Sequence, residues 1–265
     1  MLKENNGQSK TLFRGLSILT VCASSGRALN LVEIAELTQL APSTVHRLLT
    51  TLQALDFLSV DPETGRWTIG VAGFRMGNAF VQSRDYTTQI RPLMIELSEE
   101  TGETVNLAIL SGARALFVSQ IESRNMMRMV APLGSVTPLH ASGAGKALLA
   151  GLSDEERNLL IDSLDYLKFT TKTHRGLRTL KREIAEVLML GCAFDREEHV
   201  AGMQCVAAPV FNEVGHPICT LSVSGPLVRI SEQVLRKHGE AVRAMGQRAT
   251  ELIGGQPPRH WIAYA

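Results

Sequence analysis

The sequence predicts an α+β fold in two parts. Residues 12–55 carry three predicted helices, of which the first and third show apolar stripes at helical spacing, and turn or cap signals separate them. After residue 104, strand-like runs alternate with helical segments, which is the pattern of a sheet with helices packed against it. With 265 residues and 45% hydrophobic content, the chain is long enough for one large or two modest cores.

The composition argues against a membrane protein, a secreted protein and a small fold stabilised by zinc or disulfides. No apolar run approaches the roughly 18 to 20 residues that span a bilayer, and the N-terminus lacks the apolar core of a signal peptide. We therefore expect a cytoplasmic protein without membrane contact. The cysteines show no CxxC spacing, which predicts reduced thiols and no zinc ribbon or disulfide scaffold. They are Cys22, Cys192, Cys205 and Cys219.

The first predicted helix ends near Gly26, and the second spans residues 31–38. In the second helix, Asn30 is a good N-cap and Glu33 stands at the third helical position, where each side chain can satisfy a free backbone amide. The first helix carries an apolar stripe at helical spacing. Its members are Leu12, Leu16, Ile18, Leu19 and Val21.

A third helix opens near Pro42, because a first-turn amide has no intrahelical partner to lose, and it runs to about Leu55. At about 100° per residue, its leucines fall on one side of the helix. The other side and its flanks are short, polar and able to donate to base edges and phosphates. This surface consists of Ser43, Thr44, His46, Arg47 and Thr50.

Residues 58–60 and 67–69 alternate like strands around a turn-rich segment, which suits a hairpin. Three helices and a hairpin make a winged helix-turn-helix, which we assign to residues 1–70. In such a unit the third helix enters the major groove, and we expect Arg14 and Arg66 to contact phosphates. Because the net charge is only +1, affinity for DNA must come from this local surface. A small helical subdomain is the alternative from the pattern alone.

Helical patterns continue at residues 71–80 and 85–101. We assign residues 71–84 to a linker helix, 85–255 to a sensor domain and 256–265 to a C-terminal tail. The sensor domain has strand-like runs at residues 104–110, 116–121, 206–211 and 218–224, and helices near Gly145, Ser153, Leu177 and Ser231. The apolar face of its last helix, residues 231–253, contains Leu235, Val242, Met245, Ala249 and Leu252.

Small residues at positions 141–145 precede a predicted helix, where they let backbone amides approach a ligand closely. Free amides at a helix start suit a carboxylate. A nucleotide site is the competing interpretation, but Ala147 follows Lys146 where a phosphate-binding loop needs Ser or Thr, and no GxGxxG is present. We therefore expect the Lys146 side chain to be solvated.

Several segments resemble the isocitrate-lyase-regulator (IclR) family of bacterial transcription factors over roughly residues 10–255. They are residues 12–19, 43–49, 68–70, 102–106, 131–134, 139–146 and 202–205. The resemblance implies a GAF-like effector-binding domain behind the DNA-binding head, double-stranded operator DNA as partner, and a homodimer or homotetramer. It also implies a regulator, expected to be a repressor of a catabolic operon of the allantoin or glyoxylate type.

The same resemblance implies an effector site for a small carboxylate, with glyoxylate as the expected ligand. Backbone amides and polar side chains would contact the ligand, and Leu133 and Met203 would form apolar walls. The polar set comprises Gly143, Ala144, Asp195, Cys205, Ser222 and Ser224. Ser222 and Ser224 are two residues apart in a strand, so they project to one face of the sheet. A hemithioacetal between Cys205 and the aldehyde is a further hypothesis.

Three alternatives remain from the residues. Asp195, Glu197, Glu198 and His199 could supply acid and base groups or metal ligands to an enzyme acting on a small oxo acid. No HExxH or GxSxG motif supports that, so we expect no enzyme, cofactor or metal, and we expect residues 197–199 to form a polar loop over the pocket. The resemblance also leaves open an activator or repressor of the same family that responds to pyruvate, an aromatic acid or a sugar acid. The third alternative is a DNA-binding structural protein without a ligand.

Overall fold

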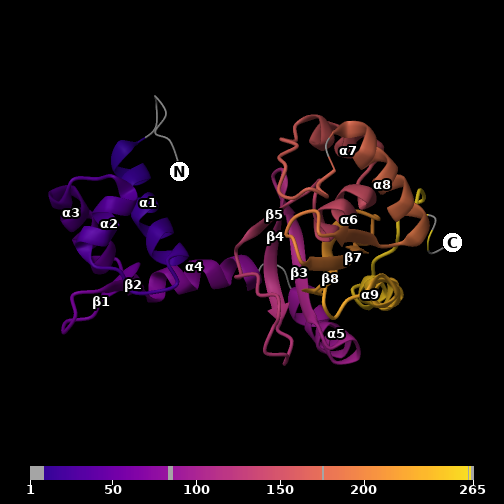
Figure 1. Cartoon of the computed structure of the whole chain (residues 1–265). Helices are drawn as coiled ribbons and strands as arrows, with labels where there is room; N and C mark the ends of the chain where they lie inside the picture. Colours follow the sequence, from indigo (N-terminus) through magenta and orange to yellow (C-terminus); the bar gives the residue numbers. More distant parts are fainter. Residues whose placement is uncertain (1–8, 83–85, 175, 262, 264–265) are drawn as a thin grey trace. The chain divides into compact units, whose positions relative to one another are not determined.

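The computed structural model describes residues 9–82, 86–174, 176–261 and 263, and it divides into two compact units, residues 1–84 and 85–265 (Figure 1). Residues 83–84 of the expected linker and residues 262, 264 and 265 of the expected tail lie outside the described residues. Within the described residues, no helix has the length and apolar character needed to cross a membrane.

The N-terminal unit is a winged helix-turn-helix followed by one further helix (Figure 1). Its elements are α1 (Lys10–Ser24), α2 (Leu31–Thr38), α3 (Pro42–Ala54), β1 (Leu58–Val60), β2 (Trp67–Ile69) and α4 (Val71–Gln82). The two strands pair antiparallel, with Ser59 opposite Thr68. The predicted helices and hairpin of this unit are therefore confirmed.

Local capping explains where α2 begins. The Asn30 side chain accepts a hydrogen bond from the Glu33 amide at 2.9 Å, and the Glu33 carboxylate accepts from the Asn30 amide at 2.8 Å. This is the predicted capping box, and it satisfies two amides that the first helical turn leaves without partners. Pro42 stands in the first turn of α3, as expected.

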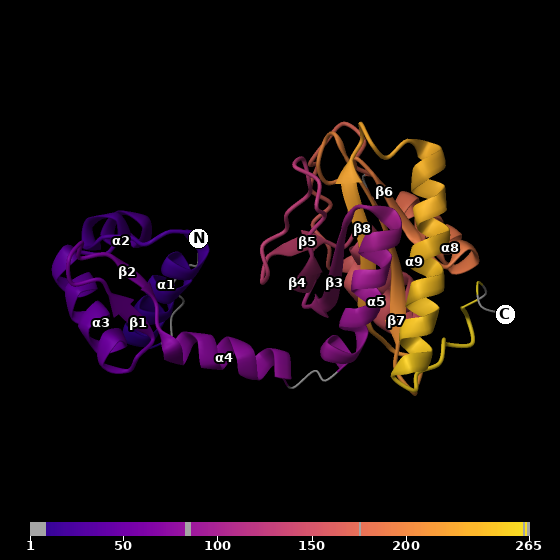
Figure 2. The same ribbon diagram turned by 90° about the horizontal axis from the view of Figure 1, so that it is seen from below.

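The unit of residues 85–265, which we call the effector unit after its expected role, is built on one antiparallel sheet of six strands in the order β5-β4-β3-β8-β7-β6 (Figure 2). Its strands are β3 (Thr104–Ser111), β4 (Arg114–Ile121), β5 (Val136–Pro138), β6 (Ala193–Arg196), β7 (Met203–Phe211) and β8 (Pro217–Pro226). Its helices are α5 (Tyr86–Thr101), α6 (Gly143–Gly151), α7 (Asp154–Asp162), α8 (Leu177–Leu190) and α9 (Glu232–Leu252).

Alternation along the strands sorts side chains into two cores. On β7, Val206, Ala208 and Val210 join the core under α5 and α9, which lie side by side in Figure 2. The intervening Ala207, together with Phe211, belongs to the core under α6, α7 and α8. The sheet is therefore covered on both faces, and a polar side chain on either face lies between the sheet and a helix layer.

Four apolar residues from the predicted helix faces are exposed instead, and one of them is Leu55 at the end of the third helix, which is 58% exposed. Leu12 and Leu16 of α1 are 62% and 52% exposed, and Leu252 at the end of α9 is 52% exposed. The buried side of α1 is narrower than its apolar stripe, because α2 and α3 cover it only through residues such as Ile18 and Cys22. Helical spacing identifies the apolar side of a helix, but it does not show how much of that side packs against other elements.

The segment after α9 packs back onto the effector unit. The Gln256 amide donates to the carbonyl of Asn212 at 3.1 Å, and the Trp261 ring, which is 3% exposed, meets Phe211 edge-on at 5.1 Å between centroids. The described part of the expected tail therefore contributes to the core under α6, α7 and α8. All four cysteines are free thiols, as predicted.

Candidate effector site and DNA-binding surface

Helix α3 presents the predicted polar surface on its outer side. Ser43, His46, Arg47 and Thr50 are exposed and Thr44 is half-buried, whereas the opposite side of the helix is buried through Val45, Leu48 and Leu49. The Thr50 hydroxyl donates to the His46 carbonyl at 2.9 Å, so its own proton is already used within the helix. The longest exposed side chains of this surface are those of His46 and Arg47.

Arg66 connects the wing to the rest of the N-terminal unit. Its Nη1 donates to the Ala28 carbonyl at 2.8 Å and lies 3.4 Å from the Glu33 carboxylate. The Asn30 amide, followed by Arg27, lowers the pKa of Glu33, so this carboxylate is charged and attracts Arg66. Part of the guanidinium expected at phosphates therefore holds β2 against the start of α2. Arg14 is half-buried on α1.

The N-terminus of α6 approaches the sheet as the small residues predict. Ser142 caps the helix, accepting from the Gly145 amide at 3.0 Å and donating to the Pro138 carbonyl at 2.6 Å. A Cβ atom on Gly145 would lie 2.4 Å from the Leu139 Cα, and one on Gly143 would lie 3.2 Å from Cys205 Sγ. A side chain at position 145 would therefore clash with the backbone of the preceding segment, and one at position 143 would force its neighbours on β6 and β7 to shift by a few tenths of an ångström.

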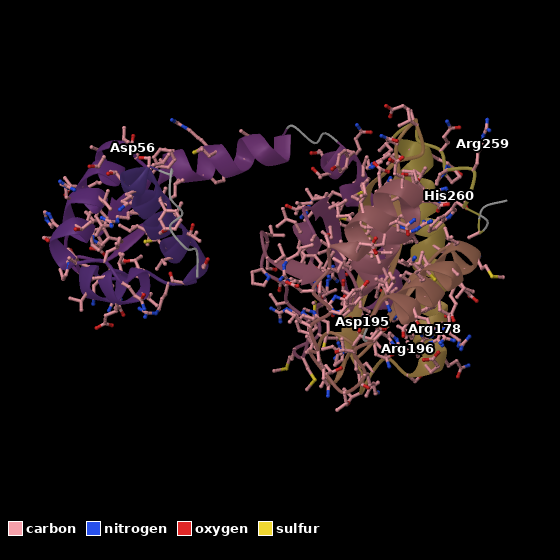
Figure 3. All side chains as sticks on the ribbon, turned by 90° about the horizontal axis from the view of Figure 1, so that it is seen from above. Asp56, Arg178, Asp195, Arg196, Arg259 and His260 are labelled. Carbon is pink, nitrogen blue, oxygen red and sulfur yellow. The ribbon has the colours of Figure 1, made fainter. Side chains whose placement is uncertain are left out.

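Strand register brings four predicted side chains to the face that α6 covers. Asp195 on β6 lies opposite Cys205 on β7, and Cys205 lies opposite Ser224 on β8. Ser222 lies two residues before Ser224 on the same strand, opposite Ala207, which belongs to the core under α6. Because directly opposed residues share a face, these side chains form one row, which we call the polar row. Asp195 and its neighbour Arg196 both come from the edge strand (Figure 3).

Asp195 is a weak acid in this environment. Burial, followed by the nearby Glu198 carboxylate, raises its pKa to about 7, against the opposing effects of Lys146 and of the amides of Glu198 and His199. The Glu198 amide donates to Asp195 Oδ1 at 2.7 Å. Near neutral pH the carboxyl group therefore exists in both protonation states, so it can accept a hydrogen bond or donate one.

Cys205 is a protonated thiol. Burial and then the neighbouring Asp195 raise its pKa to about 12. The thiolate, which is the nucleophile in additions to an aldehyde, is therefore scarce at neutral pH. This argues against the hemithioacetal hypothesis and favours a role for Cys205 in shape and packing.

The prediction of a solvated Lys146 is wrong. Its side chain is fully buried, and Nζ lies 2.6 and 2.8 Å from the two carboxylate oxygens of Glu198 and 3.3 Å from Glu183. The next turn of α6 points this lysine under α8 and the segment after β6, rather than into water. Its partners are 37 and 52 residues away in sequence, so no local pattern reveals them.

The acidic cluster that suggested an enzyme separates in three directions. Asp195 joins the polar row, Glu198 pairs with Lys146, and the Glu197 carboxylate pairs with Lys172 and accepts from the Gly202 amide. The His199 ring contacts the Thr137 hydroxyl at 3.3 Å. The carboxylates do not converge on one substrate position. Strand β6, which contains Asp195, was not predicted.

His174, Glu183 and Glu198 bring three ligand-type atoms within 4.8 Å of one another. The Lys146 ammonium already lies between these two carboxylates and supplies the positive charge that a metal would bring. The arrangement therefore has the chemistry of a buried ion-pair network.

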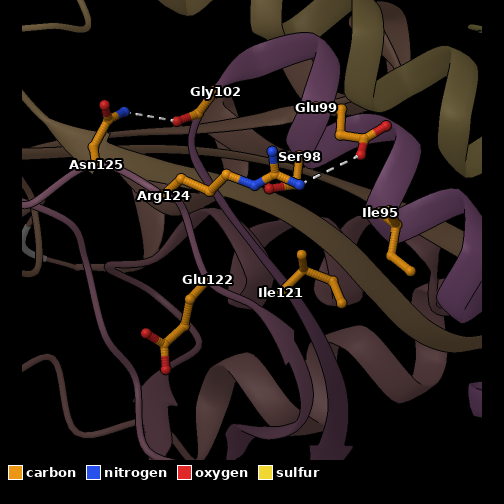
Figure 4. A pocket seen from close by; sticks show the side chains of 8 residues that line it. All are labelled: Ile95, Ser98, Glu99, Gly102, Ile121, Glu122, Arg124 and Asn125. Carbon is orange, nitrogen blue, oxygen red and sulfur yellow. Dashed lines mark hydrogen bonds and ion pairs between the residues drawn. The ribbon is translucent and has the colours of Figure 1, made fainter.

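The expected apolar walls differ in position. Leu133 is 63% exposed, whereas Met203 is half-buried at the start of β7. A groove of about 370 Å³ lies elsewhere, between the end of α5 and the end of β4 (Figure 4). Its lining includes Glu99, Glu122 and Arg124 and none of the predicted effector residues.

Sequence reasoning missed Asn106, whose buried amide side chain lies on β3. The available signal was a polar residue within an otherwise apolar strand.

Comparisons with known proteins agree with this architecture. The model of the bacterial transcriptional regulator IclR C-terminal domain matches residues 78–250, and that of the IclR helix-turn-helix domain matches residues 11–62. The crystal structure of the Thermotoga maritima IclR has a TM-score of 0.80 at 23% identity, with 92% of this chain and 98% of that chain covered. This likeness shows the fold.

Two curated relatives come from Escherichia coli strain K12. The transcriptional repressor IclR is 39% identical over 251 residues, which cover 94% of this chain and 92% of the relative. The HTH-type transcriptional repressor AllR is 39% identical over 246 residues, covering 93% and 91%. Both names describe transcriptional repressors, which supports the prediction that the chain is not an enzyme. The chain belongs to the IclR family of bacterial transcriptional regulators and is of the IclR and AllR repressor type.

Proposed function

We propose that the chain represses a catabolic operon of the allantoin or glyoxylate type, and that glyoxylate or another small 2-oxo acid releases it from operator DNA. The observation that carries the proposal is the polar row, in which Asp195, Cys205 and Ser224 stand in register beside the N-terminus of α6. A two-carbon acid needs many hydrogen bonds in little space, and this row supplies them.

The proposed contacts follow from donor and acceptor chemistry. The amides of Gly143 and Ala144 and the hydroxyls of Ser222 and Ser224 donate to the carboxylate, which only accepts. Asp195 accepts from a hydrated aldehyde when ionised and donates to a carbonyl when protonated. Its pKa of about 7 makes both states accessible at neutral pH. Met203 is the better placed of the two proposed apolar walls, because Leu133 is mostly exposed.

The proposed DNA contact is α3 in the major groove. Ser43, Thr44, His46, Arg47 and Thr50 contact base edges and nearby phosphates in this proposal, while Arg14 and the remaining donors of Arg66 contact the backbone. Exposed Val71, Phe74 and Met76 on α4, with Leu12 and Leu16 on α1, support association of the heads in a homodimer or homotetramer. Two heads then occupy successive half-sites.

The effector acts by binding one quaternary arrangement more tightly than another. A ligand with equal affinity for the DNA-bound and released arrangements shifts nothing, however tightly it binds. The polar row joins β6, β7 and β8 to α6, so a ligand there links the edge of the sheet to the helix layer. This linkage is the proposed route by which occupancy changes the arrangement of subunits.

The test is fluorescence anisotropy of the full chain on DNA from upstream of its own gene, at fixed salt, with and without millimolar glyoxylate. Tight binding that glyoxylate weakens supports the repressor and the effector together. Binding that glyoxylate strengthens supports the effector and reverses its sign. Binding that responds only to pyruvate, an aromatic acid or a sugar acid replaces glyoxylate by that class, and binding that ignores all of them rejects the effector model.

A further inference from the structure

Asn106 lies next to the polar row but was not among its predicted members. It is fully buried on β3 and stands directly opposite Ser222 on β8, so the two side chains share the α6 face. Among the described residues, Asn106 Nδ2 and Ser222 Oγ are buried atoms without a hydrogen-bond partner. Two unpaired donors thus stand at adjoining positions of the candidate effector site.

A neighbouring amide determines which end of Asn106 is the donor. Gln120 on β4 donates through Nε2 to Asn106 Oδ1 at 2.6 Å and to the Ala131 carbonyl at 3.2 Å. A backbone carbonyl only accepts, so the Gln120 atom between them must be its NH₂ group. Asn106 therefore presents its oxygen to β4. Because β8 lies on the other side of β3, the NH₂ group of Asn106 is directed away from β4, toward the row.

The chemistry of this pair calls for an acceptor. A buried donor without a partner loses its hydration and gains nothing in return, and a ligand oxygen that accepts from it recovers the loss. The residues flanking Asn106, Val105 and Leu107, point into the opposite core and offer no acceptor. A carboxylate has two oxygens and no donor, which matches an amide NH₂ and a hydroxyl standing side by side.

We propose that Asn106 is an effector-binding residue, which donates through Nδ2, together with the Ser222 hydroxyl, to the carboxylate of a short 2-oxo acid. Gln120 is a positioning residue that holds the Asn106 amide in the donating orientation without touching the ligand. This inference rests on the proposed function, because it assigns new residues to the same effector site.

The test is isothermal titration calorimetry of the full chain with glyoxylate and with pyruvate. Asn106→Asp keeps the shape and the oxygen that accepts from Gln120, but it replaces the donating NH₂ by an oxygen. We expect it to weaken binding of the acid about 10-fold to 100-fold. The matched control is Asn212→Asp, another isosteric change in the same unit, at a side chain whose oxygen accepts from the Val214 and His216 amides in the turn between β7 and β8. The control should keep wild-type affinity.

Gln120→Glu provides a second variant should Asn106→Asp fail to fold. A glutamate at this position accepts, so the Asn106 amide turns its NH₂ toward β4 and its oxygen toward the row. Binding of the acid should fall by at least about threefold, while operator affinity without effector stays unchanged. Wild-type affinity for the acid in a folded Asn106→Asp or Gln120→Glu variant overturns this inference alone. A wild-type chain that binds neither acid overturns the proposed function with it.

Discussion

Replacing Lys146 by methionine tests whether the buried ammonium supports the effector unit. The change removes the charge and nearly preserves the side-chain length. Glu198, whose side chain is 3% exposed, then loses the cation that contacts both of its oxygens, whereas Glu183 is 15% exposed and can turn toward water. Leaving one buried charge without its partner typically costs about 3–5 kcal/mol. We expect Lys146→Met to destabilise the unit by that amount.

The double variant separates the ion pair from simple packing. Glu198→Gln alone leaves the buried ammonium with the single carboxylate of Glu183 at 3.3 Å and should also be costly, but Lys146→Met with Glu198→Gln removes both charges of the closest pair. The double variant should therefore lose at least about 2 kcal/mol less than the sum of the two single losses. The short distances of 2.6 and 2.8 Å from Nζ to both Glu198 oxygens are the structural reason for this coupling.

Urea unfolding of the full chain measures these losses. In a Trp67→Phe background, Trp261 is the remaining tryptophan and reports on the effector unit, where it packs on Phe211. Lys172→Met is the control, because Lys172 is 57% exposed and its pair with Glu197 is screened by water, so its loss should stay below about 1 kcal/mol. A Lys146→Met loss as small as the control's, or additive losses in the double variant, would refute the reasoning.

Three further outcomes follow from the structure. Arg47→Ala should weaken operator binding by about 1–3 kcal/mol in anisotropy titrations, and unchanged affinity would remove Arg47 from the DNA contact. Cys205→Ser should retain glyoxylate binding within about 10-fold in calorimetry, because a thiol with a pKa of about 12 keeps its proton, and abolished binding would restore the hemithioacetal. Asp195 has its pKa raised from 3.8 to about 7, so the folded state holds this proton more tightly than the unfolded state. Its contribution to stability is present below pH 4 and is lost as the pH rises to 7, by up to about 1.4 kcal/mol per pH unit. Urea midpoints measured against Asp195→Asn should show this difference, and parallel pH profiles would contradict it.

Features with short-range causes were predictable from the sequence. The capping box at Asn30 and Glu33, the start of α3 at Pro42 and the wing hairpin each depend on residues within a few positions of one another. Backbone amides at a helix start need partners wherever the helix lies, so these signals work without knowledge of the tertiary neighbours. The family, and with it the list of effector residues, came from motifs that are likewise contiguous.

The effector residues illustrate an intermediate case. The period of two in a strand predicts that Ser222 and Ser224 share a face. That Asp195 and Cys205 stand on the same face requires the pairing of β6 with β7 and of β7 with β8. Strand β6 has four residues and was missed as a strand because, unlike the shorter strands of the wing, it is not paired across a turn-rich segment with a second alternating run.

The residues whose environment was predicted wrongly, or whose role was missed, have partners that are distant in sequence. The sequence around Lys146 is typical of a surface lysine, because no neighbouring residue in the chain indicates that Glu183 or Glu198 will pair with it. The donor of Asn106 is identified only through Gln120 on the next strand and through the placement of Ser222 on the other side. Helix starts, strand faces and the family follow from contiguous residues, because local hydrogen bonding and side-chain period act within one segment. Protonation, pairing and burial follow from packing, because they depend on which distant groups replace water around each side chain.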